Sequence, residues 1–131
     1  MTITPIDPVE RIASVPAIDV RVDDELQVVA QQMIENDVGT VVVRRASEEA
    51  GVISERDLVR SMAEPSEEHD DAVRASDLMT FDPVVVSTDE SIERAAALMV
   101  EGGIRHLPVA RDGKIVGVVS MRDVLRVYSE G

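Results

Sequence analysis

Two short segments of the chain carry side chains that could hold a sugar and its phosphate. Both have the pattern Gly-x-x-Ser-x-Arg-Asp, at 51–57 and at 117–123. An ionised carboxylate only accepts hydrogen bonds, so Asp57 and Asp123 could each bind the two neighbouring hydroxyl groups of a ribose. The serine of each pattern begins a predicted helix, where free backbone amides and the helix dipole attract an anion. The two patterns therefore suit a ribose and its phosphate.

The same residues also have a purely structural interpretation. Ser-x-x-Asp is a capping box, in which Ser54 or Ser120 and the aspartate three residues later satisfy free amides at the start of a helix. A single pattern of this kind is more often structural than functional. The glycines favour binding, because Gly51 and Gly117 carry no side chain and let another group approach the strand closely.

The two patterns belong to a tandem repeat. A shift of 66 residues aligns 20–60 with 86–126 without a gap, and the glycine, serine, arginine and aspartate of both patterns coincide. A unit of this length cannot bury its own apolar face. We therefore expect the two copies to share one core and to leave equivalent clefts between them.

Each copy has the same predicted order of elements. Apolar residues at helical spacing indicate a first helix, and two β-branched runs separated by a polar loop indicate a hairpin. The fold class is therefore α/β, with two β-α-β-β-α repeats. The expected elements are leading strands at 18–22 and 84–86, first helices over 26–34 and 92–100, hairpins at 40–44 with 51–54 and 106–110 with 114–120, and second helices from Ser54 and Ser120.

Composition divides the chain further. The expected boundaries are an N-terminal tail over 1–10, a first repeat over 11–62, an acidic linker over 63–75 and a second repeat over 76–131. The linker contains a proline and lacks an apolar period. Its residues 67–71 are of metal-ligating types, but a linker lacks the rigid spacing that coordination requires, so no metal site is expected.

Several classes of function are disfavoured by composition. The net charge of −13 repels nucleic-acid phosphates and anionic lipid, and Phe81 and Tyr128 are the only aromatic residues, too few to stack bases. There is no cysteine, no apolar run of the ~18 residues that could span a bilayer, and no signal-peptide pattern at the start. We expect a cytoplasmic protein that binds neither nucleic acid nor membrane.

At this point the chain resembles a tandem pair of cystathionine β-synthase (CBS) domains, also called a Bateman module. The resemblance covers about residues 9–129 and rests on LQVVAQQM and IERAAALM in the first helices, on Gly-Ile-Arg-His-Leu-Pro-Val at 103–109, and on GVISERD and GVVSMRD. It implies two repeats packed with pseudo-two-fold symmetry in a stand-alone protein. It also implies that AMP, ADP, ATP or S-adenosylmethionine binds in clefts between the repeats, with no required cofactor.

The resemblance assigns roles to particular residues. It makes Asp57 and Asp123 the ribose acceptors, places Ser54 and Ser120 against phosphate or ribose oxygen, and places the side chains of 105 and 106 against phosphates. Arg105 and His106 fit that role in the second copy, whereas the first copy has Gly39 and Thr40 there. We therefore expect one strong cleft and one weak or empty cleft. The nucleotide-binding residues implied are Asp123, Ser120, Gly117, Arg105, His106, Arg122, Thr80, Val84, Asp57, Ser54, Gly51, Thr40 and Ile18.

Contacts to the adenine follow from the same resemblance. Backbone groups near the start of each leading strand usually hold the base, which points to Thr80, Asp82 and Val84 in the second copy. The corresponding residues of the first copy are Ser14, Pro16 and Ile18.

The expected function is regulatory. No nucleophile lies in a catalytic context, so the chain is not expected to be an enzyme. We expect a sensor of an adenine nucleotide that signals to a regulated partner protein by a change of conformation or of dimer packing. The resemblance implies a homodimer whose surface includes Leu58 and Val59 with Val124 and Leu125, although core burial would explain these residues equally well. The alternative is a ligand-free module for protein interaction, in which Ser-x-x-Asp is only a cap.

Overall fold

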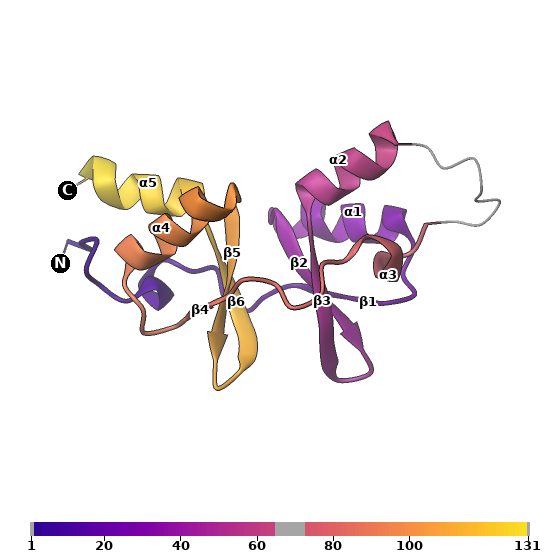
Figure 1. The fold of residues 1–131 in the computed structure, drawn as a ribbon, viewed down its shortest axis with the longest axis horizontal. Helices are drawn as coiled ribbons and strands as arrows, with labels where there is room; N and C mark the ends of the chain where they lie inside the picture. The colour runs from indigo at the N-terminus through magenta and orange to yellow at the C-terminus, as the bar shows by residue number, and fades with distance from the viewer. Residues whose placement is uncertain (1, 65–72, 131) are drawn as a thin grey trace. The chain divides into compact units, whose positions relative to one another are not determined.

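The chain folds into two units, each built on a three-stranded sheet (Figure 1). The computed structural model describes residues 2–64 and 73–130. The N-repeat unit is Ile18–Pro83, and the C-repeat unit is Met1–Ala17 with Val84–Gly131. The predicted α/β class with two repeats is confirmed.

The N-repeat unit has the strand order β1-β2-β3, with β1 parallel to β2 and β2 antiparallel to β3. Helices α1 and α2 contact each other beside this sheet (Figure 1). The elements are β1 (Asp19–Arg21), α1 (Leu26–Asn36), β2 (Thr40–Arg45), β3 (Glu48–Ser54), α2 (Glu55–Ala63) and α3 (Ala75–Leu78).

The C-repeat unit repeats this plan, with the order β4-β5-β6 and the same strand directions. A short 3-10 helix from the start of the chain is added to it. The elements are η1 (Val9–Arg11), β4 (Val86–Ser87), α4 (Ile92–Gly102), β5 (His106–Arg111), β6 (Lys114–Ser120) and α5 (Met121–Glu130).

Alternation along the strands gives each sheet two faces. In the N-repeat unit, Val41, Val43 and Ile53 lie in a cluster with α1, and in the C-repeat unit Leu107 and Val119 lie in a cluster with α4 and α5. The intervening strand residues therefore lie on the opposite face of each sheet. Among the described residues each unit therefore has a core cluster of its own, where the sequence predicted one core for both copies.

Each unit is completed by the segment that precedes the other repeat in the sequence. The Ser14 N–H donates to the Val118 carbonyl at 2.9 Å, and the Val118 N–H donates back to the Ser14 carbonyl at 3.1 Å. Thr80 forms the same pair of bonds with Val52, at 2.9 and 3.1 Å. The unit boundaries at 17/18 and 83/84 therefore place residues 11–17 in the C-repeat unit and residues 76–83 in the N-repeat unit, whereas the sequence analysis placed 11–17 with the first repeat and 76–83 with the second.

The prediction that residues 1–10 form a loose tail is wrong. Val9 is fully buried in the C-repeat core, and its N–H donates to the Glu90 carbonyl at 2.7 Å. The Ile92 N–H donates to the Asp7 carbonyl at 3.0 Å. The start of the chain is fixed because its apolar residue fills the core beside α4.

The expected linker over 63–75 is bounded by structure at both ends. Helix α2 ends at Ala63, and Ala75 begins α3 and is buried in the N-repeat core. Residues 65–72, with the metal-ligating types at 67–71, lie outside the described residues. Within the described part of the chain, no helix is long and apolar enough to cross a membrane.

Candidate functional site

A complete capping box joins β6 to α5. The Oδ2 atom of Asp123 accepts from the Ser120 N–H at 3.0 Å and from the Ser120 hydroxyl at 2.8 Å. The Asp123 N–H donates to the Ser120 Oγ at 3.1 Å. The interpretation of Ser-x-x-Asp as a capping box is therefore confirmed, since these bonds satisfy amides at the start of the helix.

The N-repeat unit has the same box between β3 and α2. Asp57 Oδ2 accepts from the Ser54 N–H at 2.8 Å and from the Ser54 hydroxyl at 3.0 Å, and the Asp57 N–H donates to Ser54 Oγ at 3.3 Å. Among the described residues, neither Asp57 nor Asp123 uses its Oδ1 atom in a hydrogen bond. Each cap therefore engages one carboxylate oxygen and leaves the other as an acceptor.

The glycine of each pattern admits a segment of the protein's own backbone. A Cβ atom on Gly117 would lie 2.6 Å from the Ser14 carbonyl oxygen, and one on Gly51 would lie 2.6 Å from the Thr80 carbonyl oxygen. No side chain fits at either position. The close approach predicted from the sequence exists, and the group that approaches is the neighbouring extended segment of the same unit.

The residues before β2 and β5 lie at the starts of the two second helices. The Met121 N–H donates to the Arg105 carbonyl at 2.8 Å, and the Glu55 N–H donates to the Gly39 carbonyl at 3.0 Å. Arg105 therefore lies at the positive end of α5, and its side chain is exposed. In the N-repeat unit the same place has Gly39, which has no side chain.

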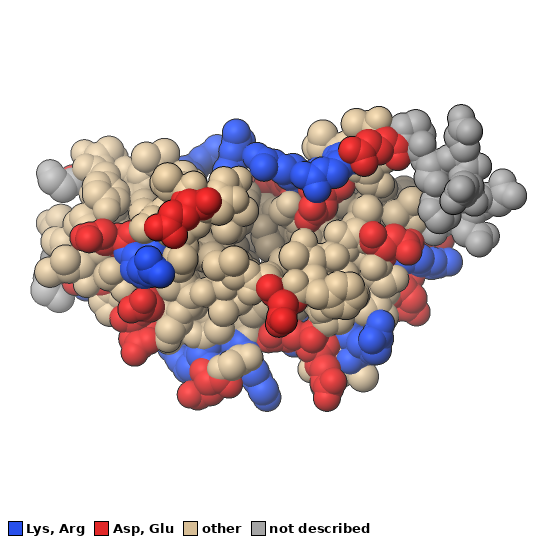
Figure 2. All heavy atoms as spheres, in the orientation of Figure 1, with Lys and Arg blue, Asp and Glu red and all other residues tan. Residues whose placement is uncertain are grey.

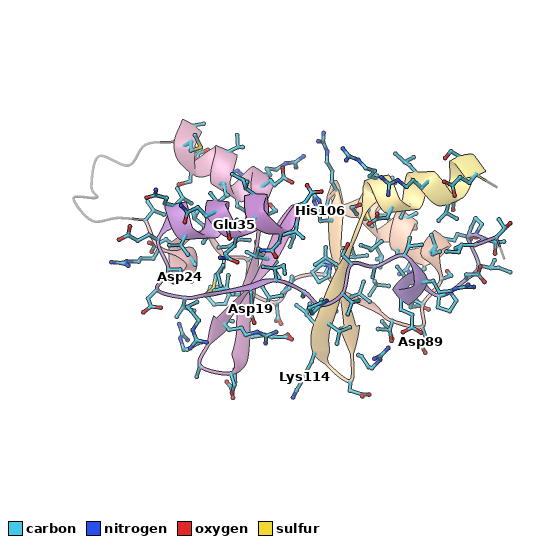
Figure 3. The ribbon with its side chains drawn as sticks, turned by 180° about the vertical axis from the view of Figure 1, so that it is seen from behind. Asp19, Asp24, Glu35, Asp89, His106 and Lys114 are labelled. Atoms are coloured by element: carbon cyan, nitrogen blue, oxygen red, sulfur yellow. The ribbon has the colours of Figure 1, made fainter. Side chains whose placement is uncertain are left out.

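The next residues, His106 and Thr40, pair with the box serines across the strands. His106 lies opposite Ser120, and Thr40 lies opposite Ser54. Figure 3 shows His106 at the start of β5, with Lys114 at the other end of the same hairpin. Figure 2 shows basic side chains near the start of β5, and it shows others over α2 of the N-repeat unit. The C-repeat unit thus has a basic region at the start of its second helix.

Thr40 is a buried polar residue with an unsatisfied side chain. It is 3% exposed, and its Oγ1 atom has no hydrogen-bond partner among the described residues. Its neighbours Val41 and Val43 point into the core, so Thr40 lies on the opposite face of the sheet with Ser54. A buried hydroxyl without a partner is costly, which makes Thr40 a candidate for contact with a bound molecule.

A hollow of about 540 Å³ lies along α5 in the C-repeat unit. Its volume is in the range of small-molecule sites. Asp123 is one of its lining residues, and the Oδ1 atom of this side chain is the one that the capping box does not use. The lining residues are Thr2, Ile3, Ile12, Asp123, Arg126, Val127 and Glu130.

Most residues of this lining were not among those predicted from the sequence. Thr2 and Ile3 were assigned to a tail, whereas they form one wall of the hollow. Arg126 lies one helical turn after Asp123, on the same face of α5. The signal for Arg126 was present, because the repeat matches it with Arg60.

The grouping of the residues predicted to contact adenine also differs from the expectation. Thr80 was placed with Asp123 in the second copy, but it pairs with Val52 in the N-repeat unit. Ser14 takes the corresponding place beside Gly117. Each unit therefore combines its own glycine, serine and aspartate with the segment that leads into the other repeat.

The remaining predicted residues are distributed between the units. The Ile18 carbonyl accepts from the Val42 N–H at 2.9 Å, so Ile18 is tied to β2 of the N-repeat unit. Val84 is 55% exposed and is the first residue of the longer segment of the C-repeat unit. Arg122 is exposed in the first turn of α5, next to Asp123. The structure thus brings the capping box and Arg105 together and leaves Val84 outside this group.

One carboxylate outside the site has a shifted pKa. The Ser87 hydroxyl donates to Asp89, and this bond, followed by a bond from the Asp89 backbone amide, lowers the pKa of Asp89 below its ordinary value of 3.8. Figure 3 shows Asp89 well apart from His106. In the residues that the structure describes, no group of three or more histidine, aspartate and glutamate side chains could hold a metal ion.

Comparison with known proteins identifies related chains. A family model for the CBS domain matches residues 3–64 and 75–130. An uncharacterized protein of Methanopyrus kandleri is 39% identical over 101 residues, which cover 76% of this chain and 51% of that protein. The mitochondrial CBS domain-containing protein CBSX3 of Arabidopsis thaliana is 32% identical over 109 residues, which cover 79% and 52%. The chain spans about half the length of these two relatives.

Solved structures agree on the fold. The CBS domain pair of protein MJ0100, in complex with 5′-methylthioadenosine and S-adenosyl-L-methionine, superposes with a TM-score of 0.82 at 22% sequence identity. The match covers 96% of this chain and 98% of that chain. At this level of identity the likeness establishes a common fold.

Proposed function

This chain belongs to the CBS domain family, and from that membership we propose that it is a regulatory protein that binds an adenosine-containing ligand, such as AMP, ADP, ATP or S-adenosylmethionine. The observation that carries the proposal is the second carboxylate oxygen of Asp123. This oxygen has no hydrogen bond among the described residues, and Asp123 lines the hollow along α5. The complex of the MJ0100 domain pair with two adenosine compounds supports the class of ligand.

The carboxylate suits a ribose because its oxygen can accept two hydrogen bonds. The vicinal hydroxyls of a ribose present two donors close together, and Asp123 Oδ1 can take both while Oδ2 stays in the cap. The hollow of about 540 Å³ has room for a nucleoside. Ligand binding therefore does not require the helix to lose its capping box.

The groups available to bind the phosphate are arginine side chains. The Ser120 hydroxyl has one hydrogen, which it already donates to Asp123, so it cannot also donate to a phosphate. Of the first amides of α5, Met121 donates to Arg105 and Asp123 donates to Ser120. We therefore assign phosphate binding to the guanidinium groups of Arg105 and Arg122, which form strong charge-assisted bonds.

Signalling requires that the ligand prefer one arrangement of the protein. A ligand with equal affinity for two states shifts nothing between them. We propose that a homodimer responds to the ligand and acts on a partner protein. Val59 and Leu125 suit such a surface because they are 64% and 59% exposed, whereas Val124 is 2% exposed and belongs to the core.

A second candidate is a ligand-free module for protein interaction. It is favoured by the completeness of both capping boxes, which give Ser54, Asp57, Ser120 and Asp123 a structural role without any ligand. Calorimetry separates the two functions. Under the second candidate, neither AMP, ATP nor S-adenosylmethionine gives heat or raises the melting temperature.

The decisive variants are Asp123→Ala and Ser120→Ala, titrated with AMP. Both break the same cap, which costs about 1 kcal/mol of stability, but only the first removes the proposed ribose acceptor. We expect Asp123→Ala to weaken AMP binding at least ~10-fold, since bonds to a charged group are lost. Ser120→Ala should change the affinity little. Equal losses in the two variants would mean that only the cap matters, and the proposal would fail.

A further inference from the structure

We propose that the two repeats bind adenosine ligands of different charge, a phosphate-bearing ligand in the C-repeat unit and an uncharged nucleoside in the N-repeat unit. This inference rests on the proposed function and adds the class of ligand for each site. It follows from positions where the two units share backbone geometry and differ in chemistry.

The backbone around the two sites is equivalent. Gly39 and Arg105 each accept a hydrogen bond from the first residue of the following helix, at 3.0 and 2.8 Å. Thr40 and His106 occupy the same register opposite Ser54 and Ser120. Differences between the side chains at these positions therefore change the ligand environment without changing the fold.

The charges at these positions have opposite sign. The C-repeat unit has Arg105, His106 and Met121, which carry one positive charge when the histidine is neutral. The N-repeat unit has glycine, threonine and Glu55 at the same places, which carry one negative charge. Arg56 and Arg122 are counterparts and do not distinguish the sites. A phosphate is thus attracted to the start of α5 and repelled by Glu55 at the start of α2.

The buried hydroxyl of Thr40 indicates what the N-repeat site takes instead. Thr40 is 3% exposed, and its Oγ1 atom is buried and has no hydrogen-bond partner among the described residues. It lies opposite Ser54, whose box holds the Asp57 carboxylate. An uncharged nucleoside can satisfy this hydroxyl and place its ribose on Asp57. A phosphate would bring charge to a buried position that has Gly39 in place of Arg105 and Glu55 in place of Met121.

The test compares adenosine with AMP, which differ only in the phosphate. Calorimetry is run on the wild-type chain and on Thr40→Val, which keeps the shape and removes the hydroxyl, with Thr40→Ser as the variant that restores it. We expect Thr40→Val to weaken adenosine binding about 10-fold and to leave AMP binding unchanged, because one buried hydrogen bond is lost at one site only. Thr40→Ser should retain adenosine binding. Since Thr40→Val removes an unsatisfied group, the ligand-free variant should be at least as stable as the wild type.

The aspartates provide the matched pair. Asp57→Ala should abolish the adenosine site and spare AMP, and Asp123→Ala should do the reverse, although both variants lose the same kind of cap. Glu55→Met copies the C-repeat residue and should raise the affinity of the N-repeat unit for AMP. Binding of two AMP molecules per chain with equal affinity, or adenosine binding that is insensitive to Thr40→Val, would overturn the inference while leaving the proposed function intact. If neither ligand binds the wild type, the proposed function itself fails.

Discussion

Replacing Gly117 by alanine tests whether the segment before the first repeat completes the second sheet. The new Cβ atom would lie 2.6 Å from the Ser14 carbonyl oxygen and 2.9 Å from the Val15 Cγ2 atom. Backbone cannot approach a methyl group so closely, so the Ser14 segment must move away from β6. The two Ser14–Val118 hydrogen bonds, at 2.9 and 3.1 Å, would then be lost.

The expected cost follows from those contacts. Each hydrogen bond contributes about 1 kcal/mol, and the strain of the inserted methyl group adds to the loss, so we expect the free energy of unfolding to fall by about 2–3 kcal/mol. Gly102→Ala is the matched control in the same unit. Its Cβ would meet no atom nearer than 3.6 Å, and alanine favours a helix, so stability should rise by up to ~1 kcal/mol.

The assay is urea denaturation of both variants, together with hydrogen exchange of the Val118 amide. We expect the unfolding midpoint to fall for Gly117→Ala and to rise slightly for Gly102→Ala. The Val118 amide should lose protection only in Gly117→Ala, since it donates to Ser14. Equal stabilities of the two variants, with the Val118 amide still protected, would refute the pairing of Ser14 with β6.

Two further predictions concern the start of the chain and the shifted carboxylate. Val9→Ala should lower the free energy of unfolding by about 2 kcal/mol because the Val9 side chain is fully buried. Ile6→Ala should have little effect because the Ile6 side chain is 78% exposed. Equal free energies of unfolding for the two variants would mean that residues 1–10 form a loose tail after all. Ser87→Ala should raise the pKa of Asp89 toward 3.8, as measured by NMR titration of the carboxylate. Since the folded-state pKa is lowered, the stability from this bond is present above pH 3.8 and is lost as the pH falls through the folded value, so the difference between Ser87→Ala and wild type should vanish in acid. An unchanged pKa in Ser87→Ala would contradict this assignment.

Local signals predicted the repeated part of the fold well. The Asp112–Gly113 pair indicated a tight turn, and both residues have positive φ, 53° and 79°. The first hairpin was placed less well, since β3 begins at Glu48 and the prediction began at 51. Glu48 and Glu49 pair with Arg45 and Arg44. Because their side chains are charged, a prediction based on runs of apolar residues left them out of the strand.

Contacts between distant parts of the sequence could not be predicted. Nothing in the local pattern around Ser14 or Thr80 says which sheet edge it joins, because one residue of extended backbone can pair with any free edge.

The buried faces of the helices were also predicted too wide, because some apolar residues at helical spacing are exposed to solvent. Ile34 and Val100 fit the helical period, yet they are 79% and 73% exposed. Periodicity identifies a helix but does not say how wide its buried face is.

At the candidate site, the Ser-x-x-Asp pattern can be both a helix cap and part of a binding site. The capping box was predicted from Ser-x-x-Asp, and it engages only Oδ2 of Asp57 and Asp123. The fold therefore accounts for why glycine, serine and aspartate occur in both copies. It does not account for the side chains at 39 and 105, since only their carbonyl oxygens bond to the helix that follows.

Positions whose side chains the fold does not require, such as 39 and 105, can differ between the copies at no cost to folding. Glycine and arginine accept the same backbone hydrogen bond, and either threonine or histidine can occupy the next position of the strand. The identical residues of the repeat therefore build the two sites, and the differing residues set what each site binds. For this reason a variant of Thr40 should change the choice of ligand, whereas a variant of Gly51 or Gly117 should change the stability of its unit.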